Sequence, residues 1–142
     1  SEHIAWFLQR SLKGINHKIK ELNLVLTEKH ISQPELQVKQ ILDTLNIKYL
    51  HDCVLSKDYK FRPDFNIQDK KILIECHGDY WHANPEKYEQ ESLTNTQKIN
   101  IEKDLYKKEY YENLGYTLII FWESDITNDI DYIKNEIIRL LI

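Results

Sequence analysis

The sequence has few of the residues that build loops and covalent cross-links. Its 142 residues include only three glycines, three prolines and two cysteines. So little glycine and proline predicts that most of the chain is regular structure, and a chain of this length can bury a core without cross-links. Cys53 and Cys76 both lie in apolar, strand-like segments, which indicates buried reduced thiols. The sequence alone leaves a disulfide between them open.

Long apolar runs are also missing. No stretch of 18 apolar residues occurs, so no membrane-spanning helix is predicted. The N-terminus lacks the basic region and apolar stretch of a signal peptide. With 42% hydrophobic and 30% charged residues, we expect a soluble, cytoplasmic, globular protein.

Positive charge is in slight deficit, with a formal net charge of −4. This balance argues weakly against a protein that wraps nucleic acid, because phosphate contacts need Lys and Arg. Total charge does not show where charges lie, however. Lysines gather at Lys98, Lys103, Lys107 and Lys108, so the sequence still allows a local basic face.

The spacing of apolar residues predicts the order of elements along the chain. Helices are predicted over 1–30, 32–46, 96–114 and 129–141, strands over 47–55, 61–68, 71–76 and 116–122, and a loop with a short helix over 84–91. This order predicts an α/β domain of three layers over residues 32–142, with a mixed four-stranded sheet flanked by helices. An N-terminal helical extension over residues 1–31 would precede it.

Two carboxylates lie in predicted strands that are otherwise apolar. Asp64 follows Pro63 within a predicted strand, and Glu75 ends the apolar run that precedes Cys76. The two strands are joined by a tight turn, so we expect the carboxylates to lie close together. A bare buried carboxylate is costly, and oxygen ligands are what Mg²⁺ prefers. Asp64, Glu75 and the carbonyl of Cys76 are therefore the predicted metal ligands, for Mg²⁺ or alternatively Mn²⁺.

Two histidines follow directly. His77 ends the predicted strand and His82 lies five residues later, and an imidazole beside a phosphate can act as a base or stabilise developing charge. Asn100 and Asp104 share one face of the long helix. The alternative interpretation is that this face is simply exposed to solvent. Glu35 lies in a first helical turn, where capping alone would explain it.

Together these residues resemble a known family. The Pro-Asp…Glu-x-His pattern is similar to the PD-(D/E)xK nucleases, with His77 in the lysine position. It resembles more closely the very-short-patch-repair (Vsr) endonucleases and the related phage or intron-encoded homing endonucleases, the EDxHD group. The matching stretches are Pro34-Glu35, Arg62-Pro63-Asp64-Phe65, Cys76-His77-Gly78-Asp79-Tyr80-Trp81-His82, Asn100 to Asp104, and Gly115 to Glu123.

The resemblance implies a restriction-endonuclease-like fold and roles for individual residues. Asp64 and the Cys76 carbonyl would bind the metal, His77 and His82 would be catalytic, and Glu35 and Asp104 would complete the catalytic set. The implied substrate is double-stranded DNA, with 5′-phosphate and 3′-hydroxyl products. The predicted DNA contacts are Asn100, Lys103, Lys107, Lys108, Tyr80 and Trp81.

The chain also departs from the repair enzymes. They carry a structural zinc, but Asp79 stands in the corresponding loop and the other cysteines are missing, so no structural zinc is predicted. Tyr80 and Trp81 could wedge into a duplex, although Trp81 could equally belong to the core. Glu75 stands where the repair enzymes have an apolar residue. These differences favour the homing-endonuclease branch.

The prediction is therefore a metal-dependent DNA endonuclease, the catalytic domain of a homing endonuclease. We expect its DNA-recognition segment to lie outside this chain, so that the domain alone binds DNA weakly. Mismatch-directed nicking in repair is one alternative, and a non-catalytic DNA-binding module is another. A zinc site of Cys76, His77 and His82 is disfavoured, since adjacent strand residues point to opposite faces. A double-strand cut would need a homodimer or two sequential nicks, and the sequence leaves both open.

Overall fold

A mixed sheet of four short strands forms the centre of the fold. The computed structural model describes residues 31–55 and 61–142. The strands lie side by side in the order β1 (Leu50–His51), β2 (Phe65–Ile67), β3 (Ile72–His77) and β4 (Thr117–Trp122). β2 pairs antiparallel with both β1 and β3, whereas β3 and β4 run parallel. The parallel pair requires a crossover, which the long helix between β3 and β4 supplies.

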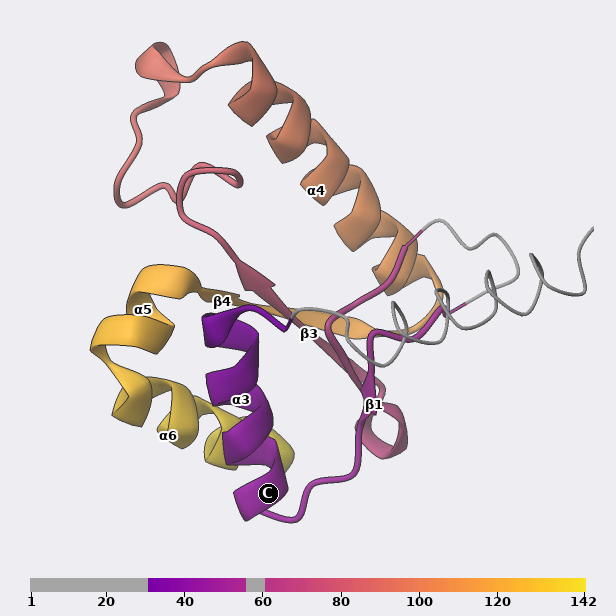
Figure 1. The fold of residues 1–142 in the computed structure, drawn as a ribbon. Helices are drawn as coiled ribbons and strands as arrows, with labels where there is room; N and C mark the ends of the chain where they lie inside the picture. Colours follow the sequence, from indigo (N-terminus) through magenta and orange to yellow (C-terminus); the bar gives the residue numbers. More distant parts are fainter. Residues whose placement is uncertain (1–30, 56–60) are drawn as a thin grey trace, which may run out of the picture. The chain divides into compact units, whose positions relative to one another are not determined.

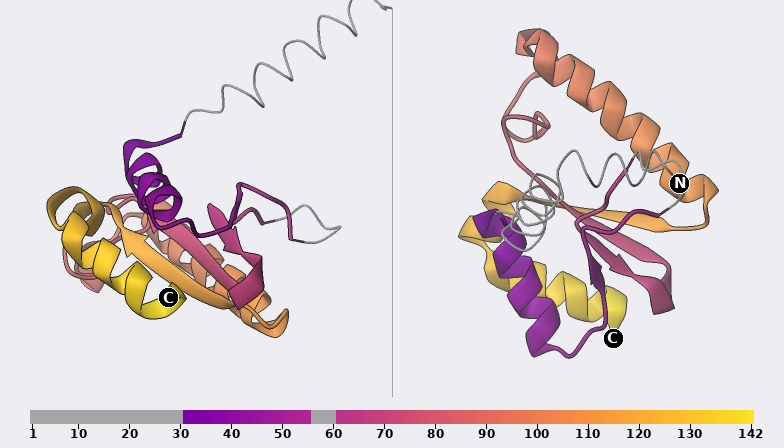
Figure 2. Two further views of the ribbon diagram at one scale, coloured as in Figure 1. Left: turned by 90° about the horizontal axis from the view of Figure 1, so that it is seen from below. Right: turned by 45° about the vertical axis from the view of Figure 1, so that its right-hand side comes forward.

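Helices cover both faces of this sheet. α3 (Gln33–Thr44), α5 (Glu123–Asn128) and α6 (Ile130–Leu141) pack on one face, and α4 (Asn95–Asn113) lies on the other (Figures 1 and 2). The predicted three-layer α/β fold with a mixed four-stranded sheet is thereby confirmed. In the part of the chain that is described, no helix is both long and apolar enough to cross a membrane.

The main core lies between the sheet and the three helices of one face. Successive strand residues alternate between faces, so β3 turns Ile74 into this core and Glu75 and His77 towards α4. The core cluster consists of Val38, Ile41, Leu42, Phe65, Ile67, Ile74, Phe121, Ile126, Ile133, Ile137 and Leu141. The α4 face of the sheet is therefore where polar side chains gather.

α4 is fixed at its start by a capping box. The Thr94 hydroxyl accepts a hydrogen bond from the amide of Gln97, and the Gln97 side chain accepts one from the amide of Thr94. The helix ends at Asn113, and Gly115 follows with a φ of +89° that suits glycine. The prediction of a helix over 96–114 was therefore correct to within a residue at each end.

The strands around the first connection are shorter than predicted. The strand expected over 47–55 contains only β1, because Asp52 adopts a left-handed φ of 51° directly after it. The strand expected over 61–68 contains only β2, which begins after Pro63 and Asp64. The expected hairpin connection is a 3₁₀ turn over Gln68–Lys70.

Two further differences concern helices. α5 was not predicted, because its six residues are too few to show a helical period. The short helix expected over 84–91 is a 3₁₀ turn at Gln90–Ser92. The predicted N-terminal extension over 1–31 lies, except for its last residue, outside the described residues.

Candidate active site

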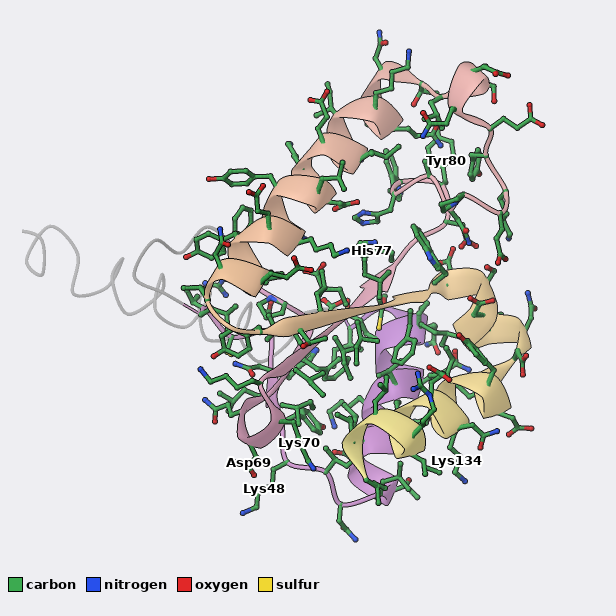
Figure 3. All side chains as sticks on the ribbon, turned by 180° about the vertical axis from the view of Figure 1, so that it is seen from behind. Lys48, Asp69, Lys70, His77, Tyr80 and Lys134 are labelled. Atoms are coloured by element: carbon green, nitrogen blue, oxygen red, sulfur yellow. The ribbon has the colours of Figure 1, made fainter. Side chains whose placement is uncertain are left out.

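The predicted site residues meet at one end of the sheet. β3 and β4 are parallel, and their last residues, His77 and Trp122, are register partners. Because β2 runs antiparallel to β3, Asp64, just before β2, lies beside the end of β3. Figure 3 shows His77 between β3 and α4. The topology thus gathers residues from distant parts of the chain at this edge.

Asp64 is a largely buried carboxylate in a negative environment. Its Oδ2 accepts a hydrogen bond of 2.7 Å from the amide of Cys76. Burial, together with the negative charges of Glu35 and Glu75, raises the pKa of Asp64 to about 7, against the opposing effect of that hydrogen bond. Three neighbouring carboxylates thus repel one another, and a cation at Asp64 would relieve that repulsion.

Glu75 is buried on the α4 face, and each of its carboxylate oxygens contacts protein groups. Its Oε1 accepts from Lys107 Nζ at 2.9 Å and from the Tyr111 hydroxyl at 3.4 Å, and its Oε2 lies 3.1 Å from Nε2 of His77. Burial opposes ionisation, but His77 and Lys107 outweigh it and hold the pKa of Glu75 below its usual range. An ionised carboxylate only accepts hydrogen bonds, so the facing Nε2 of His77 carries the proton.

His82 has its own carboxylate partner on α4. Its Nδ1 lies 2.7 Å from Oδ2 of Asp104, so in the neutral ring the proton lies on Nδ1 and the lone pair on Nε2. The rings of His77 and His82 stack, with centroids 3.9 Å apart and planes inclined by 14°. The two imidazoles therefore lie in contact, with a carboxylate at Nε2 of His77 and another at Nδ1 of His82, so that in their neutral forms they are opposite tautomers.

His77, His82 and Asp104 also have the composition of a metal site. One ligand atom from each lies within 4.8 Å of the others. An imidazole binds a metal in the plane of its ring, however, and two nearly parallel planes 3.9 Å apart do not converge on one ion. As arranged, Asp104 and one ring could share an ion. Cys76 packs against the core on the opposite face of β3, so the zinc site with Cys76, considered above, does not form.

Glu35 lies at the start of α3 and contacts a histidine that sequence reasoning missed. Its Oε2 is 3.3 Å from Nε2 of His51 on β1, and both side chains are about one-fifth exposed. The charge of Glu35 also acts on Asp64. Nothing in the local sequence distinguishes His51, because its partner is 16 residues earlier.

The loop that carries His82 is fixed by a cluster around Asp79. This carboxylate accepts from Asn84 Nδ2 at 2.9 Å, from the Ser124 hydroxyl at 3.1 Å and from Lys87 Nζ at 3.1 Å. Burial opposes its ionisation, but these three donors hold the pKa of Asp79 below its usual range. The cluster thus ties the loop to the start of α5 through protein groups.

α4 holds the same loop from its other side. Gln97 Nε2 donates to the carbonyl of Tyr80, and Asn100 Nδ2 donates to the carbonyl of Trp81, both at 2.8 Å. The two aromatic side chains remain 47% and 59% exposed, so Trp81 is not a core residue. Asn100, a predicted DNA contact, therefore also positions the loop.

Two cavities open on either side of His82 and Asp104. One, of about 690 Å³, is lined by Asn100, Lys103 and Lys107, three of the predicted DNA contacts. The other, of about 670 Å³, is largely apolar and contains Lys108 in its wall. Lys108 therefore faces a different side of α4 from Lys103, and Lys107 is already paired with Glu75.

Comparison with known proteins places the chain beside two DNA-cleaving enzymes. No protein-family model matches the chain. The type II nicking enzyme V.NmeAIP of Neisseria meningitidis serogroup A / serotype 4A is 25% identical over 103 residues, which are 68% of this chain and 71% of that enzyme. The solved catalytic domain of homing endonuclease I-Bth0305I is 28% identical, with a TM-score of 0.57, over 78% of this chain and 94% of that domain. The resemblance read from the sequence is thereby confirmed: the chain is similar to a nicking enzyme and to a homing endonuclease catalytic domain.

Proposed function

We propose that this chain is a metal-dependent DNA endonuclease domain of the homing-endonuclease kind, acting on double-stranded DNA in the cytoplasm. One observation carries the proposal. A buried carboxylate with a raised pKa, Asp64, shares one end of the sheet with two histidines that are each oriented by a carboxylate. The similarity to the two nucleases named above supports it.

The donor chemistry fits a hard divalent cation such as Mg²⁺ or Mn²⁺. Asp64 supplies a carboxylate oxygen that is costly to ionise without a positive partner, and the backbone carbonyl of Cys76 would supply a second oxygen. Glu35 adds negative charge nearby. When bound there, such an ion supplies positive charge that polarises a phosphate oxygen.

The protein's own groups would handle the proton and the developing charge. His82 exposes Nε2 as a basic nitrogen because Asp104 engages Nδ1, and this nitrogen can take a proton from an attacking water. Stacked against it, His77 presents Nδ1, and when this nitrogen is also protonated the imidazolium can stabilise charge on the phosphate or protonate the leaving oxygen. Hydrolysis would leave a 5′-phosphate and a 3′-hydroxyl.

Cleavage of supercoiled plasmid with Mg²⁺ tests this function. The wild type is expected to nick or linearise the plasmid, and both Asp64→Asn and His82→Ala are expected to lose that activity. As a control, Glu109→Gln removes an exposed charge from α4 and should cleave like the wild type. A wild type that cleaves no plasmid with either Mg²⁺ or Mn²⁺ would refute the proposal.

A second candidate is nicking at mismatches, which the exposed Tyr80 and Trp81 favour. Aromatic side chains on a rigid loop can insert between base steps and detect weakened stacking. Short duplexes with and without one T:G pair separate the two functions. Faster nicking beside the T:G pair would favour repair, and equal rates would favour the homing-endonuclease type.

A further inference from the structure

The surroundings of Glu75 assign it a role different from the metal ligand that its sequence position suggests. The residue is 4% exposed and lies between β3 and α4. A buried carboxylate needs hydrogen-bond partners, and here protein groups supply three of them.

Both carboxylate oxygens of Glu75 are already engaged. Lys107 and Tyr111 donate to Oε1, and His77 faces Oε2. A cation at Oε1 would lie next to the ammonium of Lys107, 2.9 Å away, and would be repelled by it. A cation at Oε2 would compete with the Nε2–H of His77 for that oxygen. Both oxygens therefore suit these protein donors better than a metal ion at Asp64.

The contact with His77 has a chemical consequence. A carboxylate paired with an ammonium accepts hydrogen bonds, so Nε2 of His77 must be the protonated nitrogen. Nδ1 makes no hydrogen bond to any residue that the structure describes, and it is left with the lone pair. A partner that fixes one ring nitrogen also sets the orientation of the ring.

We propose that Glu75 is a positioning residue that holds His77 as its Nε2–H tautomer, with Lys107 and Tyr111 anchoring the carboxylate, and that it does not bind the metal. This inference rests on the proposed function. The Lys107 ammonium then serves Glu75 rather than a DNA phosphate. His77 and His82 are stacked as opposite tautomers because Glu75 and Asp104 grip different nitrogens.

The tautomer can be read directly by ¹⁵N NMR of the histidine rings in the metal-free protein. In the wild type, the proton of His77 is expected on Nε2, and that of His82 on Nδ1. Glu75→Gln places an amide at Nε2 that can donate as well as accept, so a mixture of His77 tautomers is expected. Glu109→Gln, the matched charge control on α4, should leave the wild-type spectrum. A wild-type His77 protonated on Nδ1 would overturn the proposal even if the Glu75 variant failed to fold.

Metal binding and kinetics separate positioning from ligation. Mn²⁺ titration by calorimetry should give Glu75→Gln an affinity within about threefold of the wild type, and Asp64→Asn at least a tenfold loss. With DNA, Glu75→Gln should lower kcat by roughly 10- to 100-fold with KM unchanged. A loss of Mn²⁺ affinity as large as that of Asp64→Asn would overturn the inference. Failure of the wild type to cleave DNA would refute the proposed function instead, and the NMR result would still decide the tautomer.

Discussion

At the scale of single residues, the site shows how neighbours assign different roles to identical side chains. His77 and His82 are in ring contact, yet each keeps a different nitrogen for chemistry. The difference arises from Glu75 on the same strand as His77 and from Asp104 on the helix opposite. Sequence spacing places the histidines near each other, but it does not show which nitrogen of each is engaged.

Asp104 should be essential for this arrangement. In Asp104→Asn the side-chain amide can donate to Nδ1 of His82, which leaves the ring proton on Nε2 and so removes the basic nitrogen, and the substitution also removes a negative charge. We expect kcat to fall on the order of 100-fold or more, with KM for DNA little changed. Steady-state cleavage of a labelled duplex measures both constants, and Glu109→Gln serves as the control. A variant within about threefold of the wild type would show that Asp104 does not orient His82.

Asp64 makes metal binding depend on pH. Its folded-state pKa of about 7 lies above the ordinary value of 3.8, so between these pH values the folded protein holds a proton that the unfolded chain releases. The stability that Asp64 contributes is present below about pH 4 and is lost as pH rises through 7, at about 1.4 kcal/mol per pH unit. A divalent ion binds only the ionised carboxylate of Asp64. Such an ion therefore restores the lost stability at pH values above the pKa of about 7.

Excess Mg²⁺ should therefore raise the melting temperature more at pH 8 than at pH 5.5. Thermal unfolding followed by circular dichroism, with and without Mg²⁺, measures the two shifts. In Asp64→Asn the shift should be small and equal at both pH values. An equal shift for the wild type at pH 5.5 and pH 8 would contradict a site built on Asp64.

At the scale of elements, the loop between β3 and α4 is the part that places the chemistry. It carries His82, and its backbone is held by Gln97 and Asn100 from α4. Its other side is held by Asp79, which gathers three donors. A network of neutral and charged hydrogen bonds can fix a loop as a bound metal would, provided that every buried member is satisfied.

Removal of the Asp79 carboxylate tests this fixing. Asp79→Ala leaves the buried amide of Asn84 with a lost acceptor, so we expect a loss of unfolding free energy of about 1–3 kcal/mol. The matched control is Asp69→Ala, an exposed carboxylate at the other end of the sheet (Figure 3), which should change stability by less than about 0.5 kcal/mol. Urea unfolding measures both.

Urea unfolding also tests the prediction that the protein has no structural zinc. Prolonged dialysis against EDTA in Mg²⁺-free buffer should leave the unfolding midpoint of the wild type unchanged, because protein groups hold the loop. A chelator-dependent loss of stability, recovered by one equivalent of Zn²⁺, would contradict that prediction.

Elements with strong local signals were predictable from the sequence. α4 has a cap at Thr94 and a glycine after its end, and the apolar runs of β3 and β4 predict strands, of which β3 is the more buried. The length of β1 was overestimated because the backbone turn at Asp52 depends on tertiary context, and β2 is shorter than predicted because it begins only after Pro63 and Asp64. α5 is too short for periodicity to detect.

The sequence identified the residues that the structure gathers at this edge of the sheet, but not the contacts between them. Spacing and resemblance identified Asp64, His77, His82 and Asp104, and the structure brings them to one edge of the sheet. A metal role for Glu75 was predicted from its position in the sequence, whereas its contact with Lys107, which lies 32 residues later on α4, was not predicted. Long-range pairs of this kind are set by packing, and only coordinates show them.

At the scale of the whole molecule, an acidic protein must present its positive charge locally to bind DNA. The net charge of −4 opposes any broad wrapping of the duplex, so few phosphates should be neutralised. Lys103 is exposed on α4 and lines the cavity that also contains His82 and Asp104. Lys70 is also exposed but lies at the opposite end of the sheet from His77 (Figure 3).

These two lysines should therefore differ in the salt dependence of DNA binding. In the cleavage-deficient Asp64→Asn background, Lys103→Gln should weaken binding and reduce the slope of log affinity against log salt by about one, since one phosphate contact is lost. Lys70→Gln should leave both the affinity and the slope unchanged, although it alters the net charge by the same amount. Fluorescence anisotropy across a salt series measures the slopes. If both variants shift together, total charge governs binding and α4 is not the face that meets DNA.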